Sequence, residues 1–294
     1  MAAQLVPMPE IEKLSAIVTR VLGGNPGKFT LQGTNTYLVG KGPWRLLIDT
    51  GEGKSSWINA LTNVLQSERA SLHGVILTHW HHDHVGGVSD VLKFFPDAKV
   101  YKHQPGVGQL DLRDGQKLAV EGATLRAFHC PGHTADHMAL FLEEENAMFT
   151  GDNVLGHGTA VFEDLIAYLR SLNQMQHQFS GRAYPGHGAI IEAGNSKIVD
   201  YIEHRKQREY QVLEVLGNGE TSQVSSVSLN RKEQDLADWT SIEIVKVIYK
   251  DVPENLHLPA ERGLLQILRK LEGEGSITHN QATNKWRLRN RAIL

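Results

Sequence analysis

The stretch from Thr78 to His84 concentrates residues that bind metals. It places four histidines and one aspartate within six positions: His79, His81, His82, Asp83 and His84. Imidazole nitrogens together with a carboxylate oxygen suit zinc and similar divalent ions. A histidine-rich surface loop that picks up metal adventitiously has the same composition, so this stretch alone does not identify a site.

Four other segments supply comparable side chains just after apolar residues. They are Asp49 in Leu47–Gly51, His133 in Pro131–Thr134, Asp152 in Thr150–Asp152, and His187 in Pro185–Gly188. Each has an ordinary explanation when it is considered alone, such as an Asx turn, a helix cap or a solvated loop histidine. Loops at the carboxyl ends of strands are where α/β folds place their chemistry, so together the segments favour a shared site.

Short apolar runs predict the strands that must position these residues. The runs cover 17–22, 34–39, 44–49, 74–77, 99–102, 125–130, 138–142, 147–149 and 182–184. Apolar residues at helical spacing predict helices over 55–67, 162–172 and 198–216. Two halves rich in strands and helices, each with ligands at strand ends, indicate two sheets face to face with helices outside.

The chain changes character after residue 217. Residues 217–231 are rich in Gly, Ser and Asn, which is typical of a linker. Thr240 to Glu243 has the pattern of a capping box that opens an apolar helix. A second helix and a hairpin follow, and this order predicts a winged helix. We therefore expect a catalytic domain over 1–217, and a linker with a winged-helix-like domain over 218–294.

The motifs and their order resemble those of the metallo-β-lactamase-like hydrolases over roughly residues 20 to 215. The resemblance implies an α/β fold, the four-layer αββα sandwich, that binds two metal ions. It assigns His79, His81 and His133 to one metal, Asp83, His84 and His187 to the other, and Asp152 to both. The Asp83–His84 pair and the bridging Asp152 resemble the glyoxalase II-like and nuclease branches of the family.

The assigned ligands imply Zn²⁺ chemistry with two ions per chain. Two dications need an anionic bridge to offset their repulsion, and a carboxylate such as Asp152 can bind both. The remaining bridge would be a hydroxide whose pKa the metals lower toward neutrality, which makes it the nucleophile. Asp83 and Asp152 are the expected catalytic carboxylates, and Asp49 is expected to orient a ligand imidazole.

Other residues near these motifs have several interpretations. His137 and His157 could donate a proton to a leaving group, although histidines in such places more often have structural roles. His82 has no place in the family's ligand set, so we expect it to be solvated. Cys130 is expected to be a small buried residue.

The motifs define the hydrolytic machinery and leave the substrate open. Residues 28–38, 131–140 and 248–257 resemble the β-lactamase-like endoribonucleases of animals, which implies a zinc-dependent nuclease that hydrolyses phosphodiester bonds of single-stranded RNA. The basic residues of 285–289 alternate with apolar ones and could follow RNA phosphates, or could belong to a solvated edge strand. The alternatives are a glyoxalase II-like thioester hydrolase and an inactive RNA- or protein-binding module.

The composition sets broad limits. The formal net charge of −3 predicts no general attraction to nucleic acid or membrane, and no apolar run approaches the ~20 residues of a membrane helix. The single cysteine excludes an intramolecular disulfide and fits a reducing compartment. The endoribonuclease resemblance implies the mitochondrial matrix. The first 20 residues make a poor presequence because Glu10 and Glu12 offset its basic residues, so the cytosol is the alternative.

Overall fold

The computed structural model describes residues 5–217 and 238–289. The chain divides into two compact units, Met1–Tyr201 and Ile202–Leu294. The domain boundary expected at residue 217 stays a prediction, and nearly all of the predicted linker lies outside the described residues.

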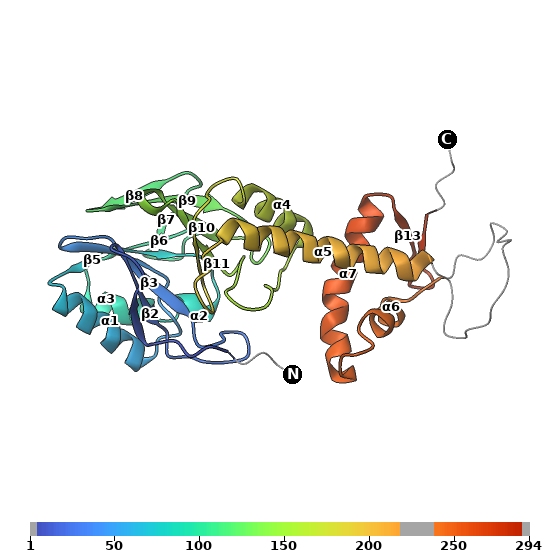
Figure 1. Cartoon of the computed structure of the whole chain (residues 1–294), viewed down its shortest axis with the longest axis horizontal. Coiled ribbons are helices and arrows are strands. Elements are labelled where there is room, and N and C mark those ends of the chain that lie inside the picture. Colours follow the sequence, from blue (N-terminus) through green and yellow to red (C-terminus); the bar gives the residue numbers. More distant parts are fainter. Residues whose placement is uncertain (1–4, 218–237, 290–294) are drawn as a thin grey trace. The chain divides into compact units, whose positions relative to one another are not determined.

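Two β-sheets form the centre of the first unit (Figure 1). The larger sheet has seven strands in chain order: β1 (Ile11–Lys13), β2 (Val18–Leu22), β3 (Asn35–Val39), β4 (Trp44–Ile48), β5 (Ser71–Leu77), β6 (Lys99–Lys102) and β7 (Leu110–Asp111). The smaller sheet has five strands in the order β12 (Ala183–Pro185), β11 (Ala147–Gly151), β10 (Met138–Leu142), β9 (Ala123–His129) and β8 (Lys117–Val120). The predicted strands are confirmed, whereas the short strands β1, β7 and β8 were not predicted.

Helices cover the outer faces of the two sheets and complete the predicted four-layer sandwich (Figure 1). The helices that begin in this unit are α1 (Ser55–Ser67), α2 (His82–Val85), α3 (Val88–Phe94), α4 (Leu165–Met175) and α5 (Gly194–Gly217), with a 3-10 turn η1 (Glu143–Glu145). Helix α1 has the predicted bounds, because its apolar stripe packs Trp57 and Leu61 against the larger sheet. In the part of the chain that the structure describes, no helix is both long and apolar enough to cross a membrane.

The main core lies between the sheets. Tyr37 and Ile48 of the larger sheet belong to the same buried cluster as Leu140 and Phe149 of the smaller one. The Tyr37 and Phe149 rings meet edge to face with their centroids 5.0 Å apart. Each fully buried side chain of this size stabilises the fold by roughly 1.5–3 kcal/mol. This core fixes the two sheets relative to each other, and with them the loops at their edges.

Strand direction brings the predicted site residues to one edge of the sandwich. Strands β4 and β5 are parallel, as are β11 and β12, and β9 runs with β11 because both are antiparallel to β10. The carboxyl ends of these strands lead directly to the five segments that carry the site residues. Contacts that join the sheets there include the Asn35 N–H, which donates to the Gly186 carbonyl at 2.7 Å, and an isolated bridge between Thr34 and His187.

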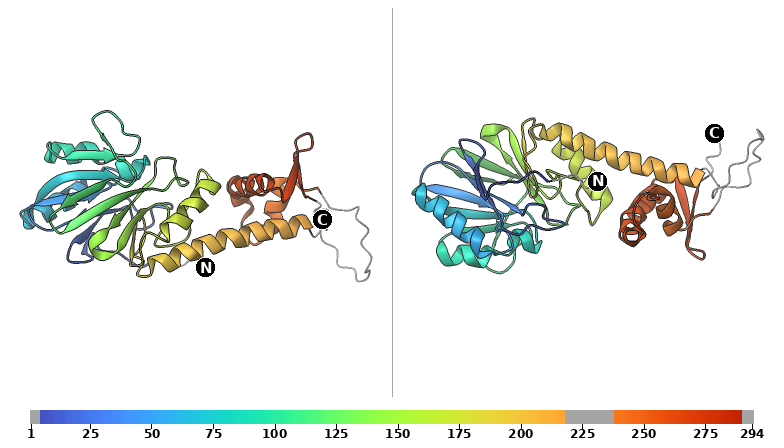
Figure 2. Two further views of the ribbon diagram at one scale, coloured as in Figure 1. Left: turned by 90° about the horizontal axis from the view of Figure 1, so that it is seen from above. Right: turned by 60° about the horizontal axis from the view of Figure 1, so that its bottom comes forward.

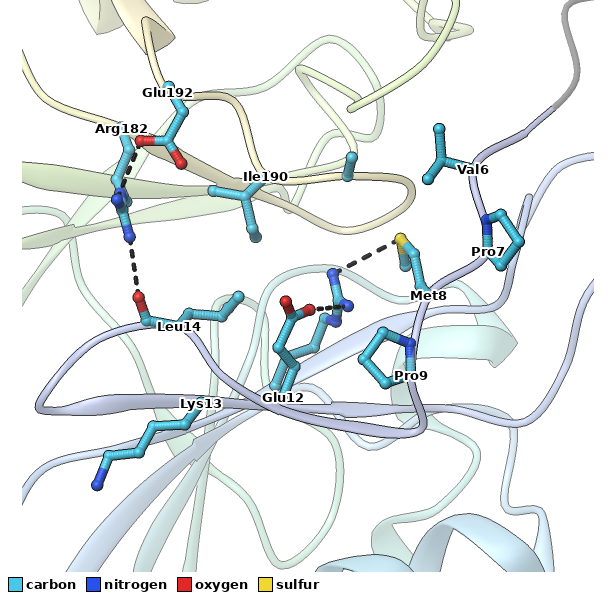
Figure 3. Close-up of a pocket in the computed structure, with 12 residues that line it drawn as sticks. Val6, Pro7, Met8, Pro9, Glu12, Lys13, Leu14, Arg182, Ile190 and Glu192 are labelled. Atoms are coloured by element: carbon cyan, nitrogen blue, oxygen red, sulfur yellow. Dashed lines mark hydrogen bonds and ion pairs between the residues drawn. The ribbon is translucent and has the colours of Figure 1, made fainter.

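The N-terminal segment lies beside Arg182, Ile190 and Glu192 (Figure 3). Arg182 donates to the Leu14 carbonyl and to the Glu192 carboxylate, both at 3.0 Å, and Arg20 pairs with Glu12. These groups line a cavity of about 360 Å³ that includes none of the predicted site residues. Because both arginines have acidic partners, their role here is to fasten the N-terminal segment.

The second unit is the predicted arrangement of helices and a hairpin (Figure 2). Besides the rest of α5 it contains α6 (Ser241–Ile248), a 3-10 turn η2 (Glu254–Leu256), α7 (His257–Gly273), β13 (Ile277–Asn280) and β14 (Lys285–Leu288). The capping box at Thr240 and Glu243 is present as predicted. Trp286 is buried and forms a bridge with Trp239, while Arg287 points to solvent, so the alternation in the last strand is also as predicted.

Candidate metal centre

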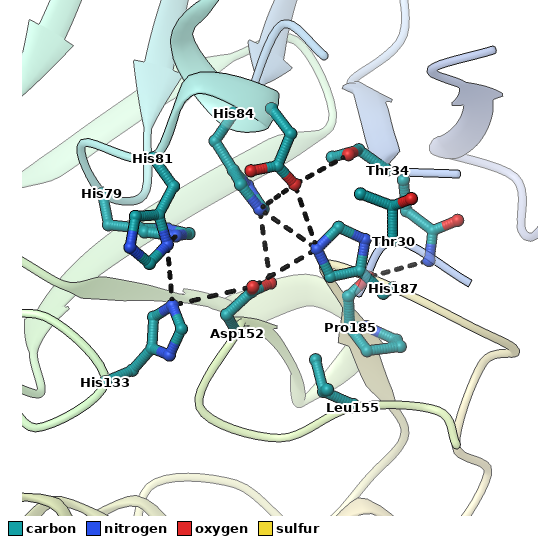
Figure 4. Close-up of polar contacts among 12 residues, drawn as sticks. Thr30, Thr34, His79, His81, His84, His133, Asp152, Leu155, Pro185 and His187 are labelled. Carbon is teal, nitrogen blue, oxygen red and sulfur yellow. Dashed lines mark hydrogen bonds and ion pairs between the residues drawn. The ribbon is translucent and has the colours of Figure 1, made fainter. Parts of the chain in front are cut away.

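Four of the predicted ligands form a first group at the sheet edge (Figure 4). His79, His81, His133 and Asp152 each direct one donor atom to a common space, with these atoms within 4.8 Å of one another. His81 Nδ1 lies 2.9 Å from His79 Nε2 and 3.1 Å from His133 Nε2. The three rings come from two loops that are far apart in the sequence.

Asp83, His84 and His187 form a second group beside the first. Asp83 Oδ2 lies 3.3 Å from His84 Nε2 and 3.2 Å from His187 Nε2. Asp152 reaches this group too, with Oδ1 3.3 Å from His84 Nε2 and Oδ2 3.2 Å from His187 Nε2. Because Asp152 Oδ2 is also 3.7 Å from His133 Nε2, its carboxylate stands between the two groups.

The donor atoms have the spacing of metal ligands. Around a tetrahedral ion with metal–nitrogen bonds of 2.0–2.1 Å, neighbouring ligand atoms lie about 3.3–3.4 Å apart. The ring nitrogens of His84 and His187 are 3.4 Å apart. Within the described residues, Asp152 Oδ1 is buried and accepts no hydrogen bond. A set of imidazoles and carboxylates so arranged could hold metal ions.

The charges of the cluster favour a cation at its centre. Burial raises the pKa of the Asp152 carboxyl group, but His187 and His84 lower it more, so it lies well below its usual value. Burial lowers the pKa of His187, but Asp152 and Asp83 raise it to about 9. Burial also lowers the pKa of His84, but Asp152 and Asp49 raise it more, so this pKa lies well above its usual value. The carboxylates thus create a negative potential that holds positive charge.

Asp49 contacts the outer side of His84, as was predicted for a residue that orients a ligand. Its Oδ2 lies 2.8 Å from His84 Nδ1, and its Oδ1 accepts the Thr78 N–H at 2.8 Å. Asp49 is buried and has a left-handed backbone with φ of 58°. Because a carboxylate only accepts hydrogen bonds, Nδ1 of His84 must carry the proton and Nε2 is left to face the cluster.

Two glycines permit the close approach of the loops that carry histidine ligands. At Gly186 an added Cβ would lie 2.2 Å from Asp152 Oδ1. At Gly132 it would lie 2.3 Å from the Cα of Tyr168, and the φ of +135° also disfavours any side chain. The Pro-Gly pairs before His133 and His187 are therefore needed for the site to close.

The remaining candidate residues differ in their burial and in their contacts. His137 is fully buried, and its Nε2 accepts the Asp152 N–H at 3.1 Å while its Nδ1 lies 3.2 Å from Cys130 Sγ. Both ring nitrogens are thus engaged within the protein, which indicates a structural role. Cys130 is buried and His82 is exposed, as expected. His157 is exposed and lines a cavity above the cluster.

We expect His137→Leu to loosen the Asp152 loop, because the Asp152 N–H would lose its buried acceptor. An unsatisfied buried donor costs about 1–3 kcal/mol of unfolding free energy. Urea denaturation measures this loss, and elemental analysis measures the accompanying fall in bound metal. Cys130→Ser is the control, because its hydroxyl can still accept from His137 and should leave both properties close to those of the parent. Unchanged stability in His137→Leu would show that the hydrogen bond is dispensable.

The cavity above the cluster involves residues that sequence reasoning missed. It has a volume of about 430 Å³, and residues 28–31, 155 and 157–161 line it beside the ligand cluster. Thr34, just after the first of these segments, donates to Asp83 Oδ2 at 3.1 Å. The motif at 28–38 is the only sequence signal for these residues, and it carries no information about which side chains face the site.

Comparisons with known proteins agree with this geometry. Residues 29–109 and 104–187 match the model of the Metallo-beta-lactamase superfamily, and residues 240–286 match that of the Beta-lactamase associated winged helix domain. The chain is 46% identical over 271 residues to the lactamase-like protein adaB of Aspergillus niger, which covers 92% of this chain and 84% of that protein. It is 44% identical over 278 residues to the atrochrysone carboxyl ACP thioesterase of Aspergillus chevalieri, covering 94% and 87%.

These relatives overturn the endoribonuclease prediction, which was wrong. The resemblance to the animal β-lactamase-like protein 2 holds only at the level of fold and motifs, since similar chains of this length are named thioesterases and lactamase-like proteins. The physical reason is that the motifs specify ligands for metal-assisted hydrolysis, which serves phosphodiesters and thioesters alike. The mitochondrial location rested on the same resemblance and stays an untested prediction. RNA binding also rested on the basic residues of 285–289, and the comparisons do not support it.

Two solved structures share the fold at low sequence identity. A metallo-beta-lactamase family protein from Thermus thermophilus has a TM-score of 0.71 at 21% identity, covering 94% of this chain and all (100%) of that one. A beta-lactamase domain protein from Burkholderia ambifaria has a TM-score of 0.78 at 14% identity, covering 98% and 96%. From the matched models and relatives, the chain belongs to the metallo-beta-lactamase superfamily of hydrolases and carries its associated winged helix domain.

Proposed function

We propose that the protein is a zinc-dependent thioesterase that hydrolyses an acyl thioester carried by an acyl carrier protein. The observation that carries the proposal is the joint arrangement of the two ligand groups and the cavity with apolar walls into which they open. Relatives more than 40% identical over nearly the whole chain are named for this reaction, on atrochrysone carboxyl ACP. The complete set of ligands argues against an inactive binding module.

The cavity favours an acyl group over a nucleic acid strand. Its walls include Phe29, Leu31, Leu155 and Val161, and its basic side chains are confined to Lys28 and histidines. A site for single-stranded RNA would be expected to present a positively charged groove that follows the phosphates. Apolar walls with a few polar groups at the base instead resemble a pocket for a small organic group.

In this proposal His79, His81 and His133 would hold one zinc ion and Asp83, His84 and His187 the other, with Asp152 as a ligand available to both groups. When bound, the two ions supply a water-derived nucleophile at neutral pH and polarise the thioester carbonyl. The protein fixes the orientation of the ligand rings. His133 donates from Nδ1 to the Val161 carbonyl at 2.8 Å, so its Nε2 faces the cluster, and Asp49 does the same for His84.

A thioester also suits this site because its hydrolysis depends little on a general acid. The leaving group is a thiol with a pKa near 8.5, so it departs as a thiolate with little need for protonation. Hydrolysis of an amide or a phosphodiester expels a far more basic atom and depends more strongly on a general acid. His137 was considered as such a proton donor, but both of its ring nitrogens already contact other groups of the protein.

We expect the purified protein to release free thiol from the 2-naphthoyl thioester of N-acetylcysteamine, a soluble substitute for a carrier-bound substrate. Removing metal with dipicolinate should reduce the rate by at least about 100-fold, because the ligands alone cannot activate water at neutral pH. Two equivalents of Zn²⁺ should restore it. A coloured disulfide reagent measures the thiol, and elemental analysis measures the metal.

Neighbouring histidines provide a matched control for this experiment. His81→Ala should lose metal and activity, whereas His82→Ala, a change at an exposed residue outside both groups, should retain them. Failure of the fully metal-loaded protein to cleave any acyl thioester would refute the proposed function.

A further inference from the structure

We infer that Phe29 and Val161 form an acyl-binding mouth that makes the protein selective for bulky, flat acyl groups over short ones. The inference rests on the proposed thioester hydrolysis and adds to it the class of acyl group and two residues that select it. The acyl mouth is defined by the cavity-lining residues 28–31, 155 and 157–161.

Both residues expose large apolar surfaces beside the ligand cluster. Phe29 is 72% exposed and Val161 is 62% exposed, although side chains of these types are usually buried. They line the same cavity as His81, Asp83 and Asp152. Exposed apolar surface that adjoins a reactive centre indicates a binding site, because covering it with substrate recovers the hydrophobic free energy.

The wall that carries Val161 is fastened to the ligands themselves. His133 donates from Nδ1 to the Val161 carbonyl at 2.8 Å, and the Gly156 N–H donates to the His187 carbonyl at 2.9 Å. The Tyr201 hydroxyl donates to the Gly158 carbonyl at 3.0 Å. Val161 is therefore held at a fixed place relative to the reacting centre.

The wall that carries Phe29 is also closed by hydrogen bonds. The Gly27 N–H donates to the Leu31 carbonyl at 3.1 Å, and the Thr30 hydroxyl donates to the Asn25 carbonyl at 2.6 Å. Asn25 in turn donates to Thr34, which contacts Asp83. Lys28 Nζ lies 5.5 Å from the centroid of the Phe29 ring, within cation–π distance. The ring is thus presented by a compact turn and not by a loose loop.

The shape of the mouth defines the acyl group. Two segments with apolar side chains line one cavity, and one of them bears an exposed aromatic ring, so the cavity fits a flat hydrocarbon group that can stack on the ring. The cavity of about 430 Å³ is within the range of about 300–1,000 Å³ that is typical of sites for small molecules. An acetyl group would leave most of this space and both side chains uncovered.

The test compares two thioesters of N-acetylcysteamine, the 2-naphthoyl and the acetyl, in Phe29→Ala and Val161→Ala. The ratio of kcat/KM for naphthoyl to that for acetyl should fall about 10- to 100-fold in Phe29→Ala and less in Val161→Ala, mainly through KM for the larger substrate. Phe94→Ala is the matched control, because Phe94 is 56% exposed on helix α3 and does not line the cavity. An unchanged ratio in both mouth variants would overturn the inference.

A binding measurement separates this inference from the proposed function. The amide analogue of the naphthoyl thioester should bind to the parent protein and at least about 10-fold more weakly to Phe29→Ala, as measured by naphthyl fluorescence. Equal binding to both would also overturn the acyl mouth, even if thioesters are cleaved. Selective binding without cleavage of any thioester would support the acyl mouth and refute the proposed reaction.

Discussion

Replacing Asp152 with alanine should abolish thioester hydrolysis. The Asp152 carboxylate stands between the two ligand groups, within 3.3 Å of His84 Nε2 and 3.2 Å of His187 Nε2. In the proposed site its removal would delete a ligand shared by both groups and the negative charge that would offset the repulsion of two cations. Loss of residues that only support metal ligands typically costs 10–100-fold, so we expect a loss of at least about 100-fold in kcat/KM.

The metal content of the Asp152→Ala variant distinguishes the reasons for this loss. We expect fewer than two metal ions per chain after dialysis, measured by elemental analysis beside the activity assay. Asp200→Ala is a suitable control, since Asp200 is exposed on helix α5 and lies outside both groups. A variant that keeps two ions and full activity would show that Asp152 is not a shared ligand.

It could be predicted that the candidate ligands lie close together, because the segments that carry them follow apolar strands. His79 follows β5, Asp152 follows β11 and His187 follows β12, and parallel pairing then brings their loops to one edge. Helix α1 could be predicted for a similar reason, since its apolar stripe is long enough to define both ends. Strand β7 has only two residues, both exposed, so no apolar pattern signals it.

The substrate could not be predicted because its binding depends on large apolar side chains that are exposed, whereas such side chains are usually buried. Phenylalanine side chains are usually buried, and only the structure shows that Phe29 is exposed and lines the cavity. The last strand suggested RNA binding because its basic residues alternate with Trp286. That alternation has a packing explanation: Trp286 is buried and bridges with Trp239, whereas Arg287 and Arg289 are exposed.

A change from Asp49 to asparagine should disable the second ligand group while the fold persists. Asp49 Oδ2 accepts the Nδ1–H of His84 at 2.8 Å, which directs the Nε2 lone pair of His84 into the cluster. An asparagine can still accept the Thr78 N–H, which Asp49 accepts at 2.8 Å, but then turns its NH₂ group toward His84. The imidazole must respond by moving its proton to Nε2, where it blocks metal binding.

We therefore expect Asp49→Asn to weaken metal binding by about 10- to 100-fold, with a comparable loss of kcat/KM. Calorimetric titration with Zn²⁺ should show one of the two equivalents weakened more than the other, because the altered tautomer belongs to His84, which is in one group only. Asp49→Ala should also unfold more easily, since its buried Thr78 and His84 donors lose their acceptor. If Asp49→Asn binds two equivalents as tightly as the parent, the ring of His84 must be oriented by its packing, and the hydrogen bond to Asp49 would serve stability alone.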